Sequence, residues 1–232
     1  MPKDVIIACD FPDRGELLGF LDRLEGHTPY LKIGMELFYA LGPGIVPELK
    51  SRGCKVFLDL KLHDIPNTVK RAMAVLADLG ADMVNVHAAG TRAMMEAALE
   101  GLSRGSGRRP LLLAVTQLTS TDQAALETEL LIPQPMERVV EAYAKNAAAA
   151  GLDGVVCSPL EAEKVHRVCG ESFLTVTPGV RFADGERGDQ KRVMTPAQAK
   201  AVGSDYIVVG RPITAAPDPA AAYERCCKEF LD

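Results

Sequence analysis

The sequence has no tryptophan, few aromatic residues and no excess of positive charge. Its 26 lysines and arginines are outnumbered by 31 aspartates and glutamates, which gives a formal net charge of −5 and an isoelectric point near 5.5. A nucleic-acid-binding surface normally appears as a basic excess or a basic stripe. The charge balance therefore argues against a nucleic-acid partner and favours a small soluble enzyme.

Long apolar runs are also missing. The N-terminal segment has only five apolar residues, 5–9, before Asp10. The apolar core of a signal peptide needs about 7 to 15 residues and a membrane-spanning helix about 20. We therefore expect no membrane partner and a cytoplasmic location.

Cysteine pairs with CxxC spacing are absent, although the chain has six cysteines. They lie mostly inside or beside apolar runs, at Cys9, Cys54, Cys157, Cys169, Cys226 and Cys227. Reduced thiols that pack as small hydrophobic side chains are favoured over disulfides or metal ligands.

The chain does contain a regular alternation of strand-like and helix-like segments. Eight short runs have the composition of strands: 4–10, 30–35, 55–64, 83–88, 111–118, 154–158, 173–180 and 206–211. Six segments between or after them are typical of helices: 15–24, 68–79, 91–102, 136–150, 159–169 and 218–231. The last of these begins with Asp218 and Pro219, a good N-cap followed by proline at the first helical position.

Strands that alternate with helices join in parallel through crossover connections, and eight such units in 232 residues predict a closed (β/α)₈ TIM barrel. An open doubly wound sheet is the competing architecture. It is disfavoured because no GxGxxG motif follows the first strand and because the strand count reaches eight. No low-complexity tract or linker divides the chain, so we expect one catalytic domain spanning residues 1–232.

The third strand carries an unusual pattern, FLDLKLHDIPNTV, at residues 57–69. Its leucines alternate with Asp59, Lys61 and His63, so one face of the strand is apolar and the other is ionic. If the leucines pack on the helices, Asp59 and Lys61 point into the barrel. Buried charges need partners, and Lys32 on the neighbouring strand is well placed to join them. A purely structural ion-pair network is the alternative.

Polar residues also end most of the other strands, where the active sites of barrels lie. They are Asp10, Lys32, Asp64, Asn85, His87, Thr116, Gln117, Thr119, Arg181 and Arg211. Taken singly, each has an ordinary structural explanation, such as a helix cap, a salt bridge or a core hydrogen bond. The loops after strands seven and eight are where barrels commonly hold phosphate, and there Gly210 and Arg211 suit an anion. Residues 181–192 have the composition of a closing lid.

With these residues located, the chain resembles the orotidine 5'-monophosphate decarboxylase family over essentially its whole length. The motifs that carry the resemblance are FLDLKLHDIPNT (57–68), KIG (32–34), MVNVHA (83–88), AVTQLTS (114–120), DGVVCS (153–158), VTPGVR (176–181), GDQKR (188–192) and VVGRPI (208–213). The third-strand motif is specific, and the others follow in the family's order.

The resemblance implies decarboxylation of orotidine 5'-monophosphate to uridine 5'-monophosphate and CO₂, the last step of de novo pyrimidine synthesis. It implies that Lys61 is the proton donor, flanked by Asp59, with Lys32 completing a charged chain to Asp64. It also implies a homodimer in which Asp64 and Thr68 reach into the partner's site. The remaining implied substrate contacts are Asp10 and Lys32 to the ribose, Thr119 or Ser120 to the pyrimidine, and Arg181, Gln190, Gly210 and Arg211 to the phosphate.

No metal or organic cofactor is expected, because a fixed ammonium such as that of Lys61 can stabilise the carbanion electrostatically and then protonate it. The nearest alternative is a Mg²⁺-dependent sugar-phosphate decarboxylase or epimerase on the same barrel, although Lys32 would repel a cation at the mouth. An aldolase-type Schiff base on Lys61 is a second alternative, but the adjacent carboxylates favour its charged, non-nucleophilic form. A catalytically silent nucleotide-binding barrel is the third.

Overall fold

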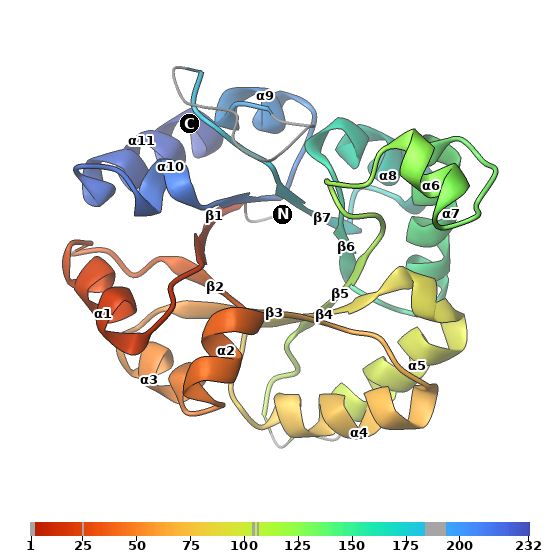
Figure 1. The fold of residues 1–232 in the computed structure, drawn as a ribbon, viewed down its shortest axis with the longest axis horizontal. Coiled ribbons are helices and arrows are strands. Elements are labelled where there is room, and N and C mark those ends of the chain that lie inside the picture. The colour runs from red at the N-terminus through yellow and green to blue at the C-terminus, as the bar shows by residue number, and fades with distance from the viewer. Residues whose placement is uncertain (1–2, 25, 104, 106, 184–193) are drawn as a thin grey trace.

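The computed structural model describes residues 3–24, 26–103, 105, 107–183 and 194–232. Eight parallel strands close into a barrel in sequence order (Figure 1). They are β1 (Asp4–Cys9), β2 (Tyr30–Gly34), β3 (Lys55–Leu62), β4 (Met83–His87), β5 (Leu111–Val115), β6 (Gly154–Val156), β7 (Leu174–Pro178) and β8 (Tyr206–Val209). The barrel closes where β1 pairs with β8, with Ile6 opposite Val208. The predicted (β/α)₈ TIM barrel is confirmed.

Helices form a ring around the strands (Figure 1). All six expected helical segments are present, as α1 (Arg14–Asp22), α4 (Pro66–Ala77), α5 (Thr91–Leu102), α7 (Met136–Ala149), η2 (Pro159–Glu161) continuing into α8 (Ala162–Cys169), and α11 (Pro219–Leu231). The Asp218 side chain accepts a hydrogen bond from the Ala221 N–H, as expected of an N-cap. Helix α4 starts two residues earlier than expected because Pro66 occupies its first turn, so Thr68 lies within the helix.

Further short helices were not expected from the sequence. They are α2 (Met35–Leu41), α3 (Ile45–Ser51), α6 (Gln123–Thr128), η1 (Ala88–Gly90), α9 (Pro196–Ala201) and α10 (Arg211–Thr214). None exceeds seven residues, so none shows a full apolar period in the sequence. The start of α9 does carry a local signal, because Thr195 and Gln198 form a capping box.

Several strands end earlier than the apolar runs suggested. Strand β5 stops at Val115 rather than at residue 118, and β6 stops at Val156 rather than at residue 158. Ser158 instead caps η2, since its hydroxyl accepts a hydrogen bond from the Leu160 N–H at 3.4 Å. Its own backbone N–H donates to the Glu161 carboxylate at 2.9 Å. Thr116, Gln117 and Ser158 therefore lie in the loops that follow these two strands.

Two hydrophobic clusters hold the barrel together. The larger lies between the strands and the helices, and Leu58 and Leu60 of β3 belong to it. The smaller fills the barrel interior and contains Ile6, Ala8, Tyr30, Phe57, Met83, Leu113, Leu174, Val176, Tyr206 and Val208. Strand alternation divides the residues between the two clusters. No helix in the described ranges is long and apolar enough to span a membrane.

Candidate functional site

The ionic face of β3 points into the barrel, as the alternation predicted. Phe57 belongs to the interior cluster, and Asp59, two residues on, is only 9% exposed. The intervening Leu58 packs outward against the helices. The charges of β3 are therefore placed over the apolar filling of the barrel, at its C-terminal mouth.

A chain of four charged side chains crosses this mouth. The Lys61 ammonium donates to Asp59 Oδ1 at 2.6 Å, and Lys32 Nζ lies 3.5 Å from Asp59 Oδ2. Lys32 Nζ also donates to Asp10 Oδ1 at 3.1 Å. Asp10, just after β1, is the solvent-exposed end of the chain, whereas Lys32 and Asp59 are largely buried. The structure thus brings together Asp10, Lys32, Asp59 and Lys61.

Mutual pairing keeps these groups charged. Burial alone would raise the pKa of Asp59, but Lys32 and Lys61 outweigh it and hold the pKa below the usual range. Burial alone would lower the pKa of Lys32, but Asp59 and Asp10 outweigh it and raise the pKa. At neutral pH the centre therefore presents a carboxylate held between two cations.

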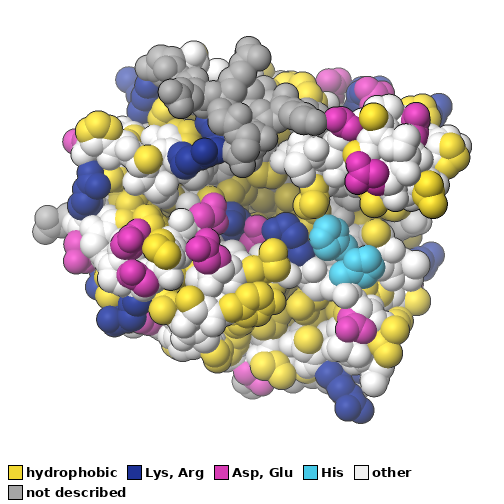
Figure 2. All heavy atoms as spheres, in the orientation of Figure 1, with side chains coloured by type: hydrophobic (Ala, Val, Ile, Leu, Met, Phe, Trp, Pro, Cys, Tyr) yellow, Lys and Arg dark blue, Asp and Glu magenta, His cyan; other side chains and the backbone are white. Residues whose placement is uncertain are grey.

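A cavity of about 210 Å³ opens beside this chain. Its lining includes Lys32, Phe57, Asp59, Lys61, Val115, Gln117, Leu118, Thr119, Ser120, Val156, Cys157, Pro178 and Val208. Figure 2 shows a central hollow with lysine or arginine, acidic and histidine side chains along its rim. Charged groups thus meet apolar walls from the opposite strands. Thr119 and Ser120, one of which is expected to meet the pyrimidine, line the same space.

Asn85 of β4 belongs to this centre, although the sequence assigned it no role in the site. It is 1% exposed and contacts two of the catalytic candidates, Asp59 and Lys61. Asn85 Nδ2 donates to Asp59 Oδ1 at 2.7 Å, and Asn85 Oδ1 accepts from the Lys61 backbone N–H at 2.8 Å. A polar residue inside the apolar run MVNVHA marks this position in the sequence.

The backbone of Lys61 is also unusual. Its φ is +50°, in the left-handed region that costs energy for a residue with a Cβ. Regular strand alternation does not predict this conformation.

Arg181, Gly210 and Arg211 follow β7 and β8 at the mouth. Arg181 is buried, and its Nη1 donates to the Val180 carbonyl at 3.0 Å. Gly210 precedes α10, and Arg211 is the exposed first residue of that helix. Gln190 and most of the expected lid, 184–192, lie outside the described residues.

Asp64 and Thr68 lie on the rim where the chain leaves β3 and enters α4. Both are exposed. The Asp64 carboxylate accepts a hydrogen bond from the Ile65 N–H at 2.6 Å. Their side chains are thus available at the surface.

Two histidines lie beside Lys61 on the same rim. The rings of His63 and His87 have centroids 5.7 Å apart. Burial, followed by the neighbouring His63 and Lys61, lowers the pKa of His87. His87 is therefore neutral at pH 7.

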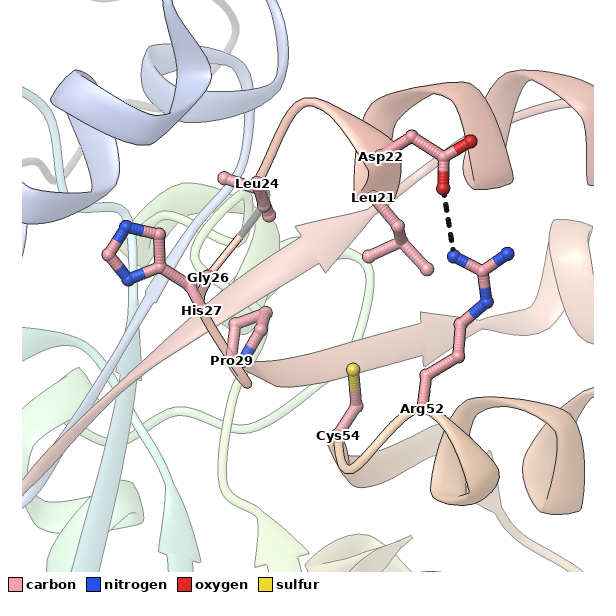
Figure 3. A pocket seen from close by; sticks show the side chains of 8 residues that line it. All are labelled: Leu21, Asp22, Leu24, Gly26, His27, Pro29, Arg52 and Cys54. Atoms are coloured by element: carbon pink, nitrogen blue, oxygen red, sulfur yellow. Dashed lines mark hydrogen bonds and ion pairs between the residues drawn. The ribbon is translucent and has the colours of Figure 1, made fainter.

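Two other cavities lie at the opposite end of the barrel, near the starts of the strands. One, of about 510 Å³, lies between the segments preceding β2 and β3, where Arg52 pairs with Asp22 (Figure 3). Within the described part of the chain, no three His, Cys, Asp or Glu side chains converge as metal ligands would. The charged chain with its adjoining cavity is thus the candidate active site.

Comparison with known proteins shows the family of the chain. The family model described as "Orotidine 5'-phosphate decarboxylase / HUMPS family" matches residues 3–226. The chain is 56% identical to an orotidine 5'-phosphate decarboxylase of Geobacillus thermodenitrificans, with 99% of this chain and 98% of that protein covered. It is 58% identical to one of Bacillus caldolyticus, with 99% and 96% covered.

Solved structures show the same relationship. The crystal structure of orotidine 5'-phosphate decarboxylase from Lactobacillus acidophilus superposes with a TM-score of 0.90 at 45% identity, covering 99% of this chain and 100% of that one. The matches extend over almost the full length of both chains, so they include every strand that contributes to the mouth. The chain belongs to the orotidine 5'-phosphate decarboxylase / HUMPS family.

Proposed function

We propose that this chain decarboxylates orotidine 5'-monophosphate to uridine 5'-monophosphate and CO₂, the last step of de novo pyrimidine synthesis, with Lys61 as the acid. Family membership and the named relatives support the reaction. The observation that carries the mechanism is the Lys61 ammonium, held 2.6 Å from a buried carboxylate at the edge of the mouth cavity.

Loss of CO₂ leaves an electron pair on a ring carbon with no adjacent carbonyl group that could easily delocalise it. A fixed ammonium in a site with apolar walls stabilises such a charge because it is already oriented and little water screens it. Lys61 then delivers a proton to the same carbon as a general acid. Phe57, Val115 and Val156 supply apolar walls of the cavity.

Asp59 has two roles in this proposal. It keeps Lys61 aimed through their hydrogen bond. It also stands near the substrate carboxylate, and two like charges about 4 Å apart repel by roughly 4 kcal/mol at an effective dielectric of 20. This repulsion disappears as neutral CO₂ leaves, so Asp59 would disfavour the bound substrate relative to the transition state.

The rest of the mouth would bind the nucleotide. Asp10 and Lys32 would contact the ribose hydroxyls, and Thr119 the pyrimidine edge. The phosphate would be held by Arg181, Gln190, Gly210 and Arg211. Contacts with the phosphate, far from the reacting carbon, would orient the substrate and drive closure of the lid over it.

A homodimer with shared sites is part of the proposal, with Asp64 and Thr68 contributed across the interface. Asp64 would complete the charged chain of the partner's site beside Lys61. Exposed apolar side chains near the same rim support an interface there, since Ile65 is 67% exposed and Tyr39 of α2 is 71% exposed. A subunit contact would cover this surface and bring Asp64 to the neighbouring mouth.

We also propose that residues 1–232 act as one catalytic domain in the cytoplasm without a metal or organic cofactor. None of the six cysteines, all within described residues, forms a disulfide, as is usual in a reducing compartment. A Mg²⁺-dependent sugar-phosphate reaction is disfavoured because the Lys32 ammonium already lies between the carboxylates of Asp10 and Asp59, where a metal ion would need them.

The test is the loss of orotidine 5'-monophosphate ultraviolet absorbance on adding purified, EDTA-treated protein. We expect rapid loss with the wild type and a rate lower by at least about 10³-fold with Lys61→Ala. Lys55→Ala is the matched control, because Lys55 lies on the same strand at the other end of the barrel and pairs with Asp4 at 2.9 Å. It should retain the rate within about threefold. No loss with folded wild-type protein would overturn the proposal.

A further inference from the structure

Strand β3 is irregular where it carries the charged pair. Leu58 pairs with Val84 of β4, and Leu62 pairs with Val86. Residues 59–61 therefore lie opposite a single residue of β4, Asn85. Such a bulge interrupts the regular hydrogen bonds of the ladder and redirects the side chains on the bulged strand.

The left-handed backbone of Lys61 lies within this bulge. A lysine does not adopt this conformation readily, so surrounding contacts must maintain it. The Lys61 backbone N–H donates to Asn85 Oδ1 at 2.8 Å, in place of a ladder hydrogen bond to a backbone carbonyl. A side chain of β4 thus holds the irregular backbone of β3.

The same amide also holds the carboxylate that pairs with Lys61. Asn85 Nδ2 donates to Asp59 Oδ1 at 2.7 Å, and that oxygen also accepts from Lys61 Nζ at 2.6 Å. The two neighbours settle the orientation of the amide, because only its oxygen can accept from an N–H and only its nitrogen can donate to a carboxylate. An aspartate here would lack the donor, and an aliphatic residue would lack both groups.

We propose that Asn85 is a positioning residue that aims the Lys61 ammonium at the reacting carbon by fixing both the Lys61 backbone and the Asp59 carboxylate. Asn85 does not line the mouth cavity, so it acts through these two residues rather than on the substrate. The inference rests on the roles proposed above for Lys61 and Asp59. It adds a requirement for an amide at position 85.

The test compares Asn85→Ala, Asn85→Ser and Asn85→Asp with the wild type in kcat, KM and thermal unfolding. We expect kcat to fall by about 30-fold or more in each variant that folds, and KM to stay within about threefold of the wild-type value. The reason is that stabilising the transition state depends on the aimed ammonium more than substrate binding does. Thr177→Val is the matched control, since Thr177 is also a buried polar strand residue, hydrogen-bonded to Ser204 and the Tyr206 carbonyl. It should lower the melting temperature without this selective loss of kcat.

Two further readouts separate positioning from general damage. Combining Asn85→Ala with Asp59→Asn should lower kcat by less than the product of the two separate effects, because both changes act on the same ammonium. Asn85→Asp should give kcat an added dependence on pH at the acidic end, since a second carboxylate beside Asp59 raises the pKa of one of the pair.

The inference is overturned if any folded Asn85 variant keeps kcat within about threefold of the wild type, or if kcat and KM worsen together as in general destabilisation. It is also overturned if the double variant shows the full product of the two effects. An inactive wild type would instead reject the proposed function, so the two failures are distinguishable. Asn85→Asp is close in size to the native residue and keeps the test available if Asn85→Ala does not fold.

Discussion

Lys61 Nζ and Asp59 Oδ1 lie 2.6 Å apart on one strand, two residues from each other in the sequence. Strand alternation alone places both side chains on the same face. Lys61 also has a left-handed backbone, with a φ of +50°, where a regular strand is extended. The pair therefore combines a sequence periodicity with a local distortion of the strand.

Asp59→Asn should lower kcat by about 10²-fold or more, because the substitution removes the charge that opposes the substrate carboxylate and aims Lys61. It should also destabilise the fold by about 2 to 3 kcal/mol, because Lys61 loses its carboxylate partner and Lys32 keeps only Asp10. This is less than for a fully buried pair, since the Lys61 side chain is 24% exposed. Urea unfolding and the absorbance assay measure the two effects.

The stability difference between wild type and Asp59→Asn should depend on pH in a defined direction. The folded-state pKa of Asp59 is lowered, so its stabilising contribution is present above the unfolded pKa, about 3.9, and is lost as pH falls through the lower folded value. The difference should be constant from pH 8 to about 5 and shrink below about 4. A difference that grows on acidification would contradict the assignment of charge.

Arg211→Ala should raise KM for orotidine 5'-monophosphate by about 10- to 100-fold, because a charge-assisted hydrogen bond to phosphate contributes about 1.5 to 3 kcal/mol. The unphosphorylated nucleoside orotidine should be turned over equally slowly by the variant and the wild type. Arg92→Ala provides a control, since Arg92 is an exposed helical arginine paired with Glu96. Equal losses for nucleotide and nucleoside would argue against a phosphate contact.

His87→Gln should reduce the dependence of stability on pH below neutrality. The folded-state pKa of His87 lies below the 6.5 of the unfolded chain, so between the two values the unfolded state binds more protons. Stability is thus retained above pH 6.5 and falls as the pH drops toward the folded pKa. Urea unfolding at fixed protein concentration between pH 8 and 5 should give a shallower decline for His87→Gln, with a constant difference above pH 7.5.

Mixing Lys61→Ala and Asp64→Ala subunits should restore activity if the sites are shared. Random pairing makes half of the dimers mixed, and each mixed dimer contains one intact site of two, so about a quarter of wild-type activity is expected. Mixing Lys61→Ala with Asp59→Asn should restore none, since both residues would come from the same chain in each site. Absence of recovery in the first mixture would exclude sharing of Asp64.

The sequence was sufficient for the architecture and for much of the candidate site. Eight apolar runs with intervening helices predicted the barrel, because strands that are joined by helical crossovers run parallel in one sheet. The alternation of residues 57–63 predicted that Asp59 and Lys61 face inward, and the polar strand ends located Asp10, Lys32 and Thr119 at the mouth. These features depend on patterns of period two along single strands, which a sequence displays directly.

Tertiary structure decided what depends on two strands at once. Asn85 bonds to Asp59 and Lys61, which lie 26 and 24 residues earlier, and the register shift between β3 and β4 creates that contact. The short helices likewise could not be predicted from the sequence, because a segment of fewer than eight residues shows no apolar period of its own. Periodicity thus determined which side chains face the interior, whereas strand register and packing decided which of them touch. Register is a property of two paired strands, so the sequence of either strand alone does not contain it.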